Sequence, residues 1–181
     1  MADRPDSQRL FLALLPDEGL RLGLAAYGAQ WQWPPGAVRY APADWHLTLH
    51  FIGSVPVRPL ADWAAALAVP FAPFRLQLGR PEPWPHGLAV LCPMTNPAPL
   101  LALQADLALA LQATGVQTDP RPFRPHLTLA RHASQAHWPE QTPVLDWPVR
   151  SYALMQSTGQ PDARYRLLQR FDGASGATRG P

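Results

Sequence analysis

The tetrapeptide His-Leu-Thr-Leu occurs twice in this chain of 181 residues, beginning at His46 and again at His126. Each copy lies in an apolar, strand-like run, and alternate side chains of a strand point to the same face. His46 and Thr48 therefore share one face of their strand, as do His126 and Thr128, and the leucines of each copy lie on the other face. The chain must accordingly contain two strands that each bury one face and present an imidazole and a hydroxyl on the other. What these strands do depends on whether their polar faces meet.

The remaining segments alternate between strand-like and helix-like patterns. Strands are expected at about residues 9–15, 38–40, 45–53, 71–78, 88–91, 126–131, 149–157 and 164–171, and helices at about residues 17–30, 59–67 and 96–114. Because helices do not follow every strand and several neighbours are hairpin-like, antiparallel pairing is favoured. The predicted fold class is α+β, with two related lobes that carry one motif strand each.

Composition indicates one folded domain. Apolar residues make up 47% of the chain, which is enough for a full hydrophobic core. The domain is expected at residues 9–171, between a flexible N-terminus at residues 1–8 and a disordered Gly/Ala/Ser-rich tail at residues 172–181. No apolar run approaches the ~20 residues of a membrane span, and the polar N-terminus lacks a signal-peptide core. A soluble cytoplasmic protein is expected, and the single Cys92, which cannot form an internal disulfide, is consistent with a reducing compartment.

The basic residues are unusual because all 15 are arginine. A coding bias toward GC-rich codons is the simplest explanation, although the planar guanidinium also suits phosphate. The formal net charge of +2 is too small to indicate a nucleic-acid partner by itself. Any such partner must be inferred from where the arginines lie.

The two H-x-T motifs, 80 positions apart, resemble those of the 2H phosphoesterase superfamily. The blocks at residues 46–53 and 121–131 and the opening strand at residues 9–16 are most similar to RNA 2′,3′-cyclic phosphodiesterases, also called 2′-5′ RNA ligases (LigT-like). The resemblance spans residues 9–171. It implies a bilobal fold with pseudo-two-fold symmetry, in which two mostly antiparallel sheets with flanking helices face each other across a central groove. The polar faces of the motif strands would then converge.

The resemblance also implies an activity, the metal-independent hydrolysis of RNA 2′,3′-cyclic phosphate ends to 2′-phosphomonoesters. In-line attack needs a base and an acid on opposite sides of phosphorus, and histidines from two facing strands meet that need because histidine titrates near neutrality. By resemblance, His46 would protonate the leaving 3′-oxygen and His126 would accept the proton of water. Thr48 and Thr128 would donate hydrogen bonds to the non-bridging phosphate oxygens. The sequence alone leaves the two histidine roles interchangeable.

Three further residues are candidates for substrate binding. Arg131 follows Thr128 by three positions, so strand parity places it on the opposite face, and a bulge or strand end would have to turn it toward the phosphate. Phe51 would lie near the substrate base, unless it is an ordinary core phenylalanine. Arg124 is a candidate for holding the RNA backbone.

His50 stands where the family often has lysine. By strand parity it shares a face with His46 and Thr48, so it lies either at the edge of the groove or on the solvated surface. No cofactor is implied, and no metal site is expected because no His/Asp/Glu cluster has ligand spacing.

Several alternatives remain open from the sequence. The same site run in reverse would join a 2′,3′-cyclic phosphate to a 5′-hydroxyl without ATP, although hydrolysis should dominate in water. ADP-ribose 1″,2″-cyclic phosphate and 2′-5′ oligonucleotides are alternative substrates. An alternative of another class is a non-catalytic module that binds RNA ends. The expected partners are RNA ends bearing a 2′,3′-cyclic phosphate, tRNA fragments among them, with no membrane partner and a monomeric protein.

Overall fold

The computed structural model describes residues 7–160 and 163–174. Within these residues the chain forms nine β-strands and three α-helices. Their bounds are β1 Ser7–Leu14, α1 Glu18–Gly28, β2 Val38–Arg39, β3 Leu47–Pro56, α2 Leu60–Ala66, β4 Phe74–Trp84, β5 Leu88–Pro93, α3 Ala98–Ala113, β6 Leu127–Arg131, β7 Leu145–Val149, β8 Ser151–Ser157 and β9 Tyr165–Asp172. Two short 3₁₀ turns, η1 at Pro42–Asp44 and η2 at Pro85–Gly87, complete the order.

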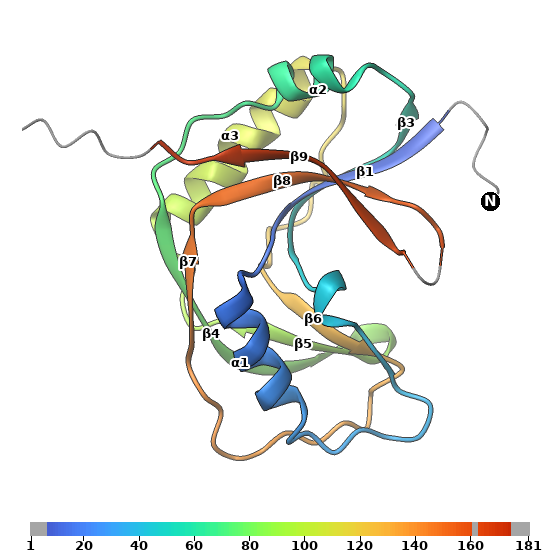
Figure 1. The fold of residues 1–181 in the computed structure, drawn as a ribbon, viewed down its shortest axis with the longest axis vertical. Helices are drawn as coiled ribbons and strands as arrows, with labels where there is room; N and C mark the ends of the chain where they lie inside the picture. The colour runs from blue at the N-terminus through green and yellow to red at the C-terminus, as the bar shows by residue number, and fades with distance from the viewer. Residues whose placement is uncertain (1–6, 161–162, 175–181) are drawn as a thin grey trace, which may run out of the picture.

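The strands form one antiparallel sheet in the order β7-β4-β5-β6-β3-β1-β8-β9, with β2 paired to β6. The α+β class and the antiparallel pairing are confirmed. The prediction of two separate sheets is wrong, because β3 and β6 pair at Leu47 and Leu127 and so join the two halves. Figure 1 shows the sheet curling, with β8 and β9 in its upper half and β4 and β5 in its lower half.

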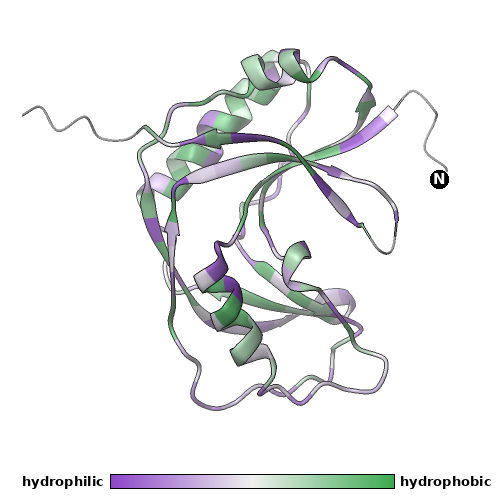
Figure 2. Cartoon of the chain, in the orientation of Figure 1, coloured by the Kyte–Doolittle hydropathy of each residue, from purple (hydrophilic) through white to green (hydrophobic). Residues whose placement is uncertain are grey.

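The helices pack against this sheet, and their buried side chains belong to the same core cluster as Leu47 and Leu127. Helix α1 packs against β7, and α3 and α2 pack beside β3 and β9 (Figure 1). The carboxylate of Asp17 caps α1 by accepting a hydrogen bond from the backbone N–H of Leu20 at 2.8 Å. The helix expected at about residues 96–114 is α3, and its leucines at helical spacing are buried, at Leu100, Leu103, Leu107 and Leu111. Figure 2 shows hydrophobic residues predominating on α3, whereas β9 carries many hydrophilic ones.

Two strand predictions differ from the structure. The strand expected at residues 149–157 corresponds to β8, whereas β7 at Leu145–Val149 was not predicted; β7 is an edge strand of the sheet, and β8 lies next to the opposite edge strand, β9. Strand β4 runs on to Trp84, although its second half contains Pro81 and Pro83. Among the described residues, this half pairs with β5 alone, because β7 begins at Leu145, opposite Leu78. Prolines are tolerated there because a strand with one unpaired edge has N–H groups that need no partner in the sheet.

The ends of the chain lie mostly outside the described residues. The flexible N-terminus predicted at residues 1–8 and the tail predicted at residues 172–181 therefore stay predictions for residues 1–6 and 175–181. Ser7 and Gln8 belong to β1, and Asp172 belongs to β9. Within the described residues, no helix has the length and apolar character required to cross a membrane.

Candidate active site

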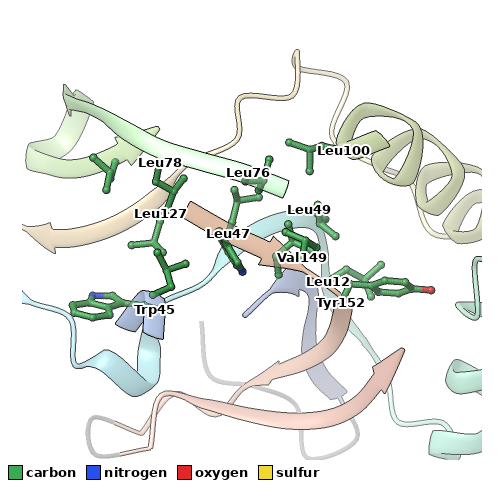
Figure 3. Packing of buried hydrophobic residues seen from close by; sticks show 14 of the residues in the cluster. Leu12, Trp45, Leu47, Leu49, Leu76, Leu78, Leu100, Leu127, Val149 and Tyr152 are labelled. Atoms are coloured by element: carbon green, nitrogen blue, oxygen red, sulfur yellow. The ribbon is translucent and has the colours of Figure 1, made fainter. Parts of the chain in front are cut away.

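The two H-x-T motifs meet where β3 pairs with β6. Leu47 and Leu127 are Cα partners and are fully buried (Figure 3). In an antiparallel pair, the position before one partner faces the position after the other. His46 therefore lies beside Thr128, while Thr48 lies beside His126. Because side chains alternate, these four residues lie on the face opposite the leucines, so the sheet brings both motifs together at one place.

The imidazole of His46 is held by its backbone surroundings and by two aromatic rings. Its Nδ1 lies 2.7 Å from the carbonyl oxygen of Asp44, the last residue of η1. The ring contacts Phe11 and Tyr165, with centroids 5.0 and 4.9 Å away. A carbonyl oxygen can only accept a hydrogen bond, so Nδ1 carries the proton and donates it. In the neutral imidazole, Nε2 is then the nitrogen that can accept a proton.

His126 repeats this arrangement in the other half of the sheet. Its Nδ1 donates to the carbonyl oxygen of Arg124 at 2.8 Å, again two residues before the histidine. The ring packs on Trp84 of β4, with centroids 4.1 Å apart. Both motifs thus fix the same tautomer by the same local bond, and both leave Nε2 for proton transfer.

Burial lowers the pKa of both motif histidines below the ordinary value for the side chain. The positive charge of His126 lowers the pKa of His46 further. Their hydrogen bonds to backbone carbonyls act in the opposite direction. Both imidazoles therefore favour the neutral form, and an anion placed between them would favour protonation of one.

The threonines of the two motifs are half-buried. Thr48 pairs with Ala13 of β1, and Thr128 pairs with Val90 of β5. Within the described part of the chain, neither hydroxyl has a hydrogen-bond partner. Both hydroxyls can therefore donate to a ligand held between the histidines.

A β-bulge at the fourth residue of each motif decides which later side chains reach this face. Leu49 has no partner on β1, because Leu12 pairs with His50 and Ala13 pairs with Thr48. Leu129 likewise has no partner on β5, because Val90 pairs with Thr128 and Ala89 pairs with Ala130. An extra residue reverses the alternation of the positions that follow it. The sequence contains no obvious signal for either bulge.

Because of these bulges, Phe51 and Arg131 occupy equivalent positions, two residues beyond the extra leucine in each strand. Arg131 lies on the face of Thr128, against simple parity, and its guanidinium lies 5.2 Å from the ring centroid of Tyr40. Phe51 pairs with Phe11, and their ring centroids are 6.5 Å apart. The side chain of Phe51 is 63% exposed, so the interpretation as a core phenylalanine is wrong.

His50 is turned the other way by the bulge at Leu49. It is only 6% exposed, and its Nε2 donates to the carbonyl oxygen of Gln104 in α3 at 2.7 Å. Both predicted locations, the groove edge and the solvated surface, are wrong. Parity failed because it counts positions along an unbroken strand, whereas His50 follows an extra residue. Burial lowers the pKa of this imidazole too.

Arg124 lies beside His126 but is not free. Its guanidinium lies 4.3 Å from the ring centroid of Trp84, and its Nη2 lies 3.4 Å from Oε2 of Glu82. Sequence reasoning missed Trp84 and Glu82, because both lie between the strands expected at residues 71–78 and 88–91. The spacing of Arg80, Glu82 and Trp84 was a usable signal, since alternate residues of a strand share a face.

A further group of residues lies beside His46, of which sequence reasoning missed Arg164 and Tyr165. The ring of Tyr40 lies between two arginines, with Arg131 at 5.2 Å and Arg164 at 5.1 Å from its centroid. Burial, together with the neighbouring Tyr40, raises the pKa of Tyr165 to about 12. Tyr165 therefore stays neutral, and its ring packs against the imidazole of His46.

A cavity of about 460 Å³ lies next to the motif strands, on the side of α1. Its lining includes Trp45, which precedes the first motif, and Leu129, which is the last residue of the second. None of the motif histidines or threonines lines it. Among the described residues, no three His, Cys, Asp or Glu side chains gather as metal ligands would.

Comparison with known proteins agrees with the resemblance of the motifs. A family model described as the 2′-5′ RNA ligase superfamily matches residues 29–161. The RNA 2′,3′-cyclic phosphodiesterase of Thermus thermophilus is 32% identical over 179 residues, which cover 90% of this chain and 89% of the relative. The protein of the same name from Escherichia coli is 34% identical over 178 residues, covering 92% of this chain and 97% of the relative.

Crystal structures of E. coli LigT have the same fold. The apo form has a TM-score of 0.78 at 25% identity and covers 94% of this chain and 99% of LigT. The complex with 3′-AMP has a TM-score of 0.81 at 26% identity and covers 94% of this chain and 100% of LigT. The matched family model extends over both motif strands, β3 and β6. The chain belongs to the 2′-5′ RNA ligase superfamily.

Proposed function

We propose that this protein hydrolyses RNA 2′,3′-cyclic phosphate ends to 2′-phosphomonoesters without a metal ion. The observation that carries the proposal is the matched pair of histidines. Each donates Nδ1–H to a backbone carbonyl, leaves Nε2 for proton transfer and lies beside the threonine of the other motif. The name shared by the relatives from Thermus thermophilus and Escherichia coli supports this choice of substrate.

In the proposed reaction, a water molecule attacks phosphorus in line with the bond to the 3′-oxygen. His126 Nε2 accepts the proton of water as the new P–O bond forms. His46 Nε2 donates its proton to the 3′-oxygen as that P–O bond breaks, so the phosphate remains on the 2′-oxygen. The hydroxyls of Thr48 and Thr128 donate to the non-bridging oxygens as negative charge grows on them.

The lowered pKa of His46 sets a condition on this assignment. A general acid must hold its proton at the working pH, and burial and the charge of His126 both oppose protonation of His46. The phosphate anion of the substrate supplies the opposing charge, because a negative charge within about 4–6 Å raises the pKa of an imidazole. Bound substrate thus favours the protonated, acidic form of His46.

The remaining candidates bind the substrate. Arg131, on the face of Thr128, would contact the phosphate through its planar guanidinium, and the exposed ring of Phe51 would stack on the terminal base. Arg124 would approach the RNA backbone with the part of its guanidinium not engaged by Glu82. The protein would act as a monomer on RNA ends, those of tRNA fragments included.

The test is turnover of a short RNA with a 2′,3′-cyclic phosphate end in the presence of EDTA. Wild type should release 2′-phosphate ends, and His46→Ala and His126→Ala should each reduce kcat by about 10²–10⁴-fold. His137→Ala, at an exposed histidine outside the site, is the matched control and should match wild type.

Two results distinguish the alternatives. A wild-type protein that binds the RNA end without any turnover would replace the hydrolase with an end-binding module. Adding an RNA with a 5′-hydroxyl should give joined 2′-5′ product only as a small fraction of the hydrolysed end.

A further inference from the structure

The two motif histidines differ in what surrounds their rings. His46 has aromatic neighbours on two strands of its own half of the sheet, Phe11 of β1 and Tyr165 of β9. Among the described residues, the single aromatic ring against His126 is that of Trp84, at the end of β4. This strand is not adjacent to β6, because β5 lies between them. Trp84 therefore reaches His126 from two strands away.

The indole of Trp84 is itself fixed. Its Nε1–H donates to Oε2 of Glu82, two residues earlier on the same face of β4, at 2.8 Å. Arg80 Nε donates to Oε1 of Glu82 at 2.9 Å, and Arg124 Nη2 lies 3.4 Å from Oε2. The guanidinium of Arg124 also packs on the indole. Glu82 is thus a carboxylate with three donors, one of which sets the orientation of the tryptophan.

We propose that Trp84 is a positioning residue for His126. Glu82 supports this role because its hydrogen bond from the indole N–H fixes the plane of the Trp84 ring. This inference rests on the proposed function, in which His126 Nε2 must point at the attacking water. The bond from Nδ1 to the carbonyl of Arg124 anchors one point of the imidazole but leaves the ring free to tilt about it. A rigid aromatic face 4.1 Å away limits that tilt.

Glu82 has an electrostatic effect on His126 as well. The charged groups that face His126 are Arg124 on its own segment, Glu82 from β4 and His46 from the other motif. The carboxylate of Glu82 raises the pKa of His126 against the effects of burial and Arg124. Removing this charge should lower the pKa of His126, which would move the acidic limb of the pH–rate profile to lower pH.

Three variants distinguish the effect of Trp84 on the orientation of the His126 ring from the effect of the Glu82 charge on the pKa of His126. Trp84→Ala removes the aromatic face and should reduce kcat by about 10–10²-fold with KM changed less than about threefold, since a misplacement of about 1 Å can cost that much. Trp84→Phe keeps a ring but loses the bond to Glu82, and should lie between Trp84→Ala and wild type. Glu82→Gln keeps an acceptor for the indole N–H, so it should shift the acidic limb downward with a smaller loss of kcat at the plateau. Trp138→Phe, at a tryptophan that packs on Trp31 away from the site, is the matched control.

NMR titration of the His126 ring in each variant provides a readout that needs no turnover. The expected result is a lowered His126 pKa in Glu82→Gln and altered ring shifts of His126, but not of His46, in both Trp84 variants. If Trp84→Ala retains wild-type kcat and unchanged His126 shifts, the inference is wrong, even where hydrolysis is established. If wild type shows no turnover, the proposed function fails, and the NMR shifts still decide whether Trp84 and Glu82 position His126.

Discussion

Leu47 and Leu127 face each other across β3 and β6, and within the described residues they are the single pair that these strands form. Both side chains are fully buried, and Figure 3 shows them side by side in the leucine-rich core. This pair connects the two halves of the sheet. It also sets the register that places each motif histidine beside the threonine of the other motif.

Truncating Leu47 and Leu127 should destabilise the protein, and the two effects on the free energy of unfolding should not be additive. Leu47→Ala and Leu127→Ala should each lower the free energy of unfolding by about 2–5 kcal/mol, because each leaves a cavity in the core. The double variant should differ from the sum by about 0.5–3 kcal/mol, since the two side chains share one contact. Urea unfolding of the four proteins measures this. Leu101→Ala, at an exposed leucine of α3, should change stability little, and strict additivity of the two core substitutions would contradict the pairing.

His50 should matter for stability and its pH dependence rather than for catalysis. Burial lowers its folded-state pKa, so the unfolded chain binds more protons, and the contribution of this group is present above about pH 6.5 and lost as pH falls through the folded pKa. His46 and His126 act in the same direction. The melting temperature of wild type should therefore fall between pH 7.5 and pH 5.

His50→Gln tests the share of this residue. Its amide can still donate to the carbonyl of Gln104 but does not titrate, so its melting temperature should fall less over the same pH range. Its kcat/KM should stay near that of wild type. His137→Gln, at an exposed site, should keep the wild-type dependence. A loss of activity in His50→Gln without a loss of stability would restore a role for His50 in the site.

The motif threonines should act through their hydroxyls. Thr48→Val and Thr128→Val keep the shape of the side chain but remove the donor, and each should reduce kcat by about 10²–10³-fold, as loss of one donor to a developing oxyanion does. Thr48→Ser and Thr128→Ser should stay within a few-fold of wild type. Steady-state kinetics with a cyclic-phosphate RNA measures both sets. Valine variants with wild-type kcat would exclude the proposed phosphate contacts.

Phe51 should contribute binding energy that depends on the base. Phe51→Ala should raise KM by about 5–150-fold, which corresponds to the 1–3 kcal/mol of one base–aromatic stack, with kcat little changed. Stability should be unaffected because the ring is 63% exposed. Phe51→Trp should retain the affinity of wild type. The decisive comparison uses a substrate whose terminal nucleotide is abasic, with which wild type and Phe51→Ala should have equal KM.

Arg131 should act on the phosphate whatever the base. Arg131→Lys keeps the charge but loses the planar fork, so kcat/KM should fall by about 10–100-fold, the range of one hydrogen bond to a charged group. Unlike the effect of Phe51→Ala, this loss should persist with the abasic substrate. Arg58→Lys, at an exposed arginine that packs on Trp63, is a matched control and should behave as wild type. Equal losses in the two lysine variants would indicate a general charge effect.

Much of the fold follows from local patterns. The stripe from Leu100 to Leu111 repeats at helical spacing, and its four leucines are buried as that spacing requires. Asp17 caps α1 because its carboxylate reaches a backbone N–H of the first turn. Patterns of this kind depend on neighbours within a few residues, and the sequence contains all of those neighbours.

The elements that could not be predicted depend on pairing between distant segments. Whether Leu49 and Leu129 are bulged is decided by their registers with β1 and β5. Strand β4 extends past Pro81 by pairing with β5, and its prolines are tolerated because the other edge has no partner strand among the described residues. A single sequence does not contain the register of one strand against another, so parity misplaced His50 and Arg131.

The sequence by itself determined that two strands each carry a histidine and a threonine on one face, because alternation is a local property of a strand. It also determined, through the flanking residues, which family these strands resemble. Only the tertiary structure decided that both motifs share one sheet, that Phe51 and Arg131 turn toward the histidines while His50 turns away, and that Trp84 lies against His126. Those outcomes require pairing registers and contacts between residues far apart in the chain, and these are fixed only when the whole sheet packs against its helices.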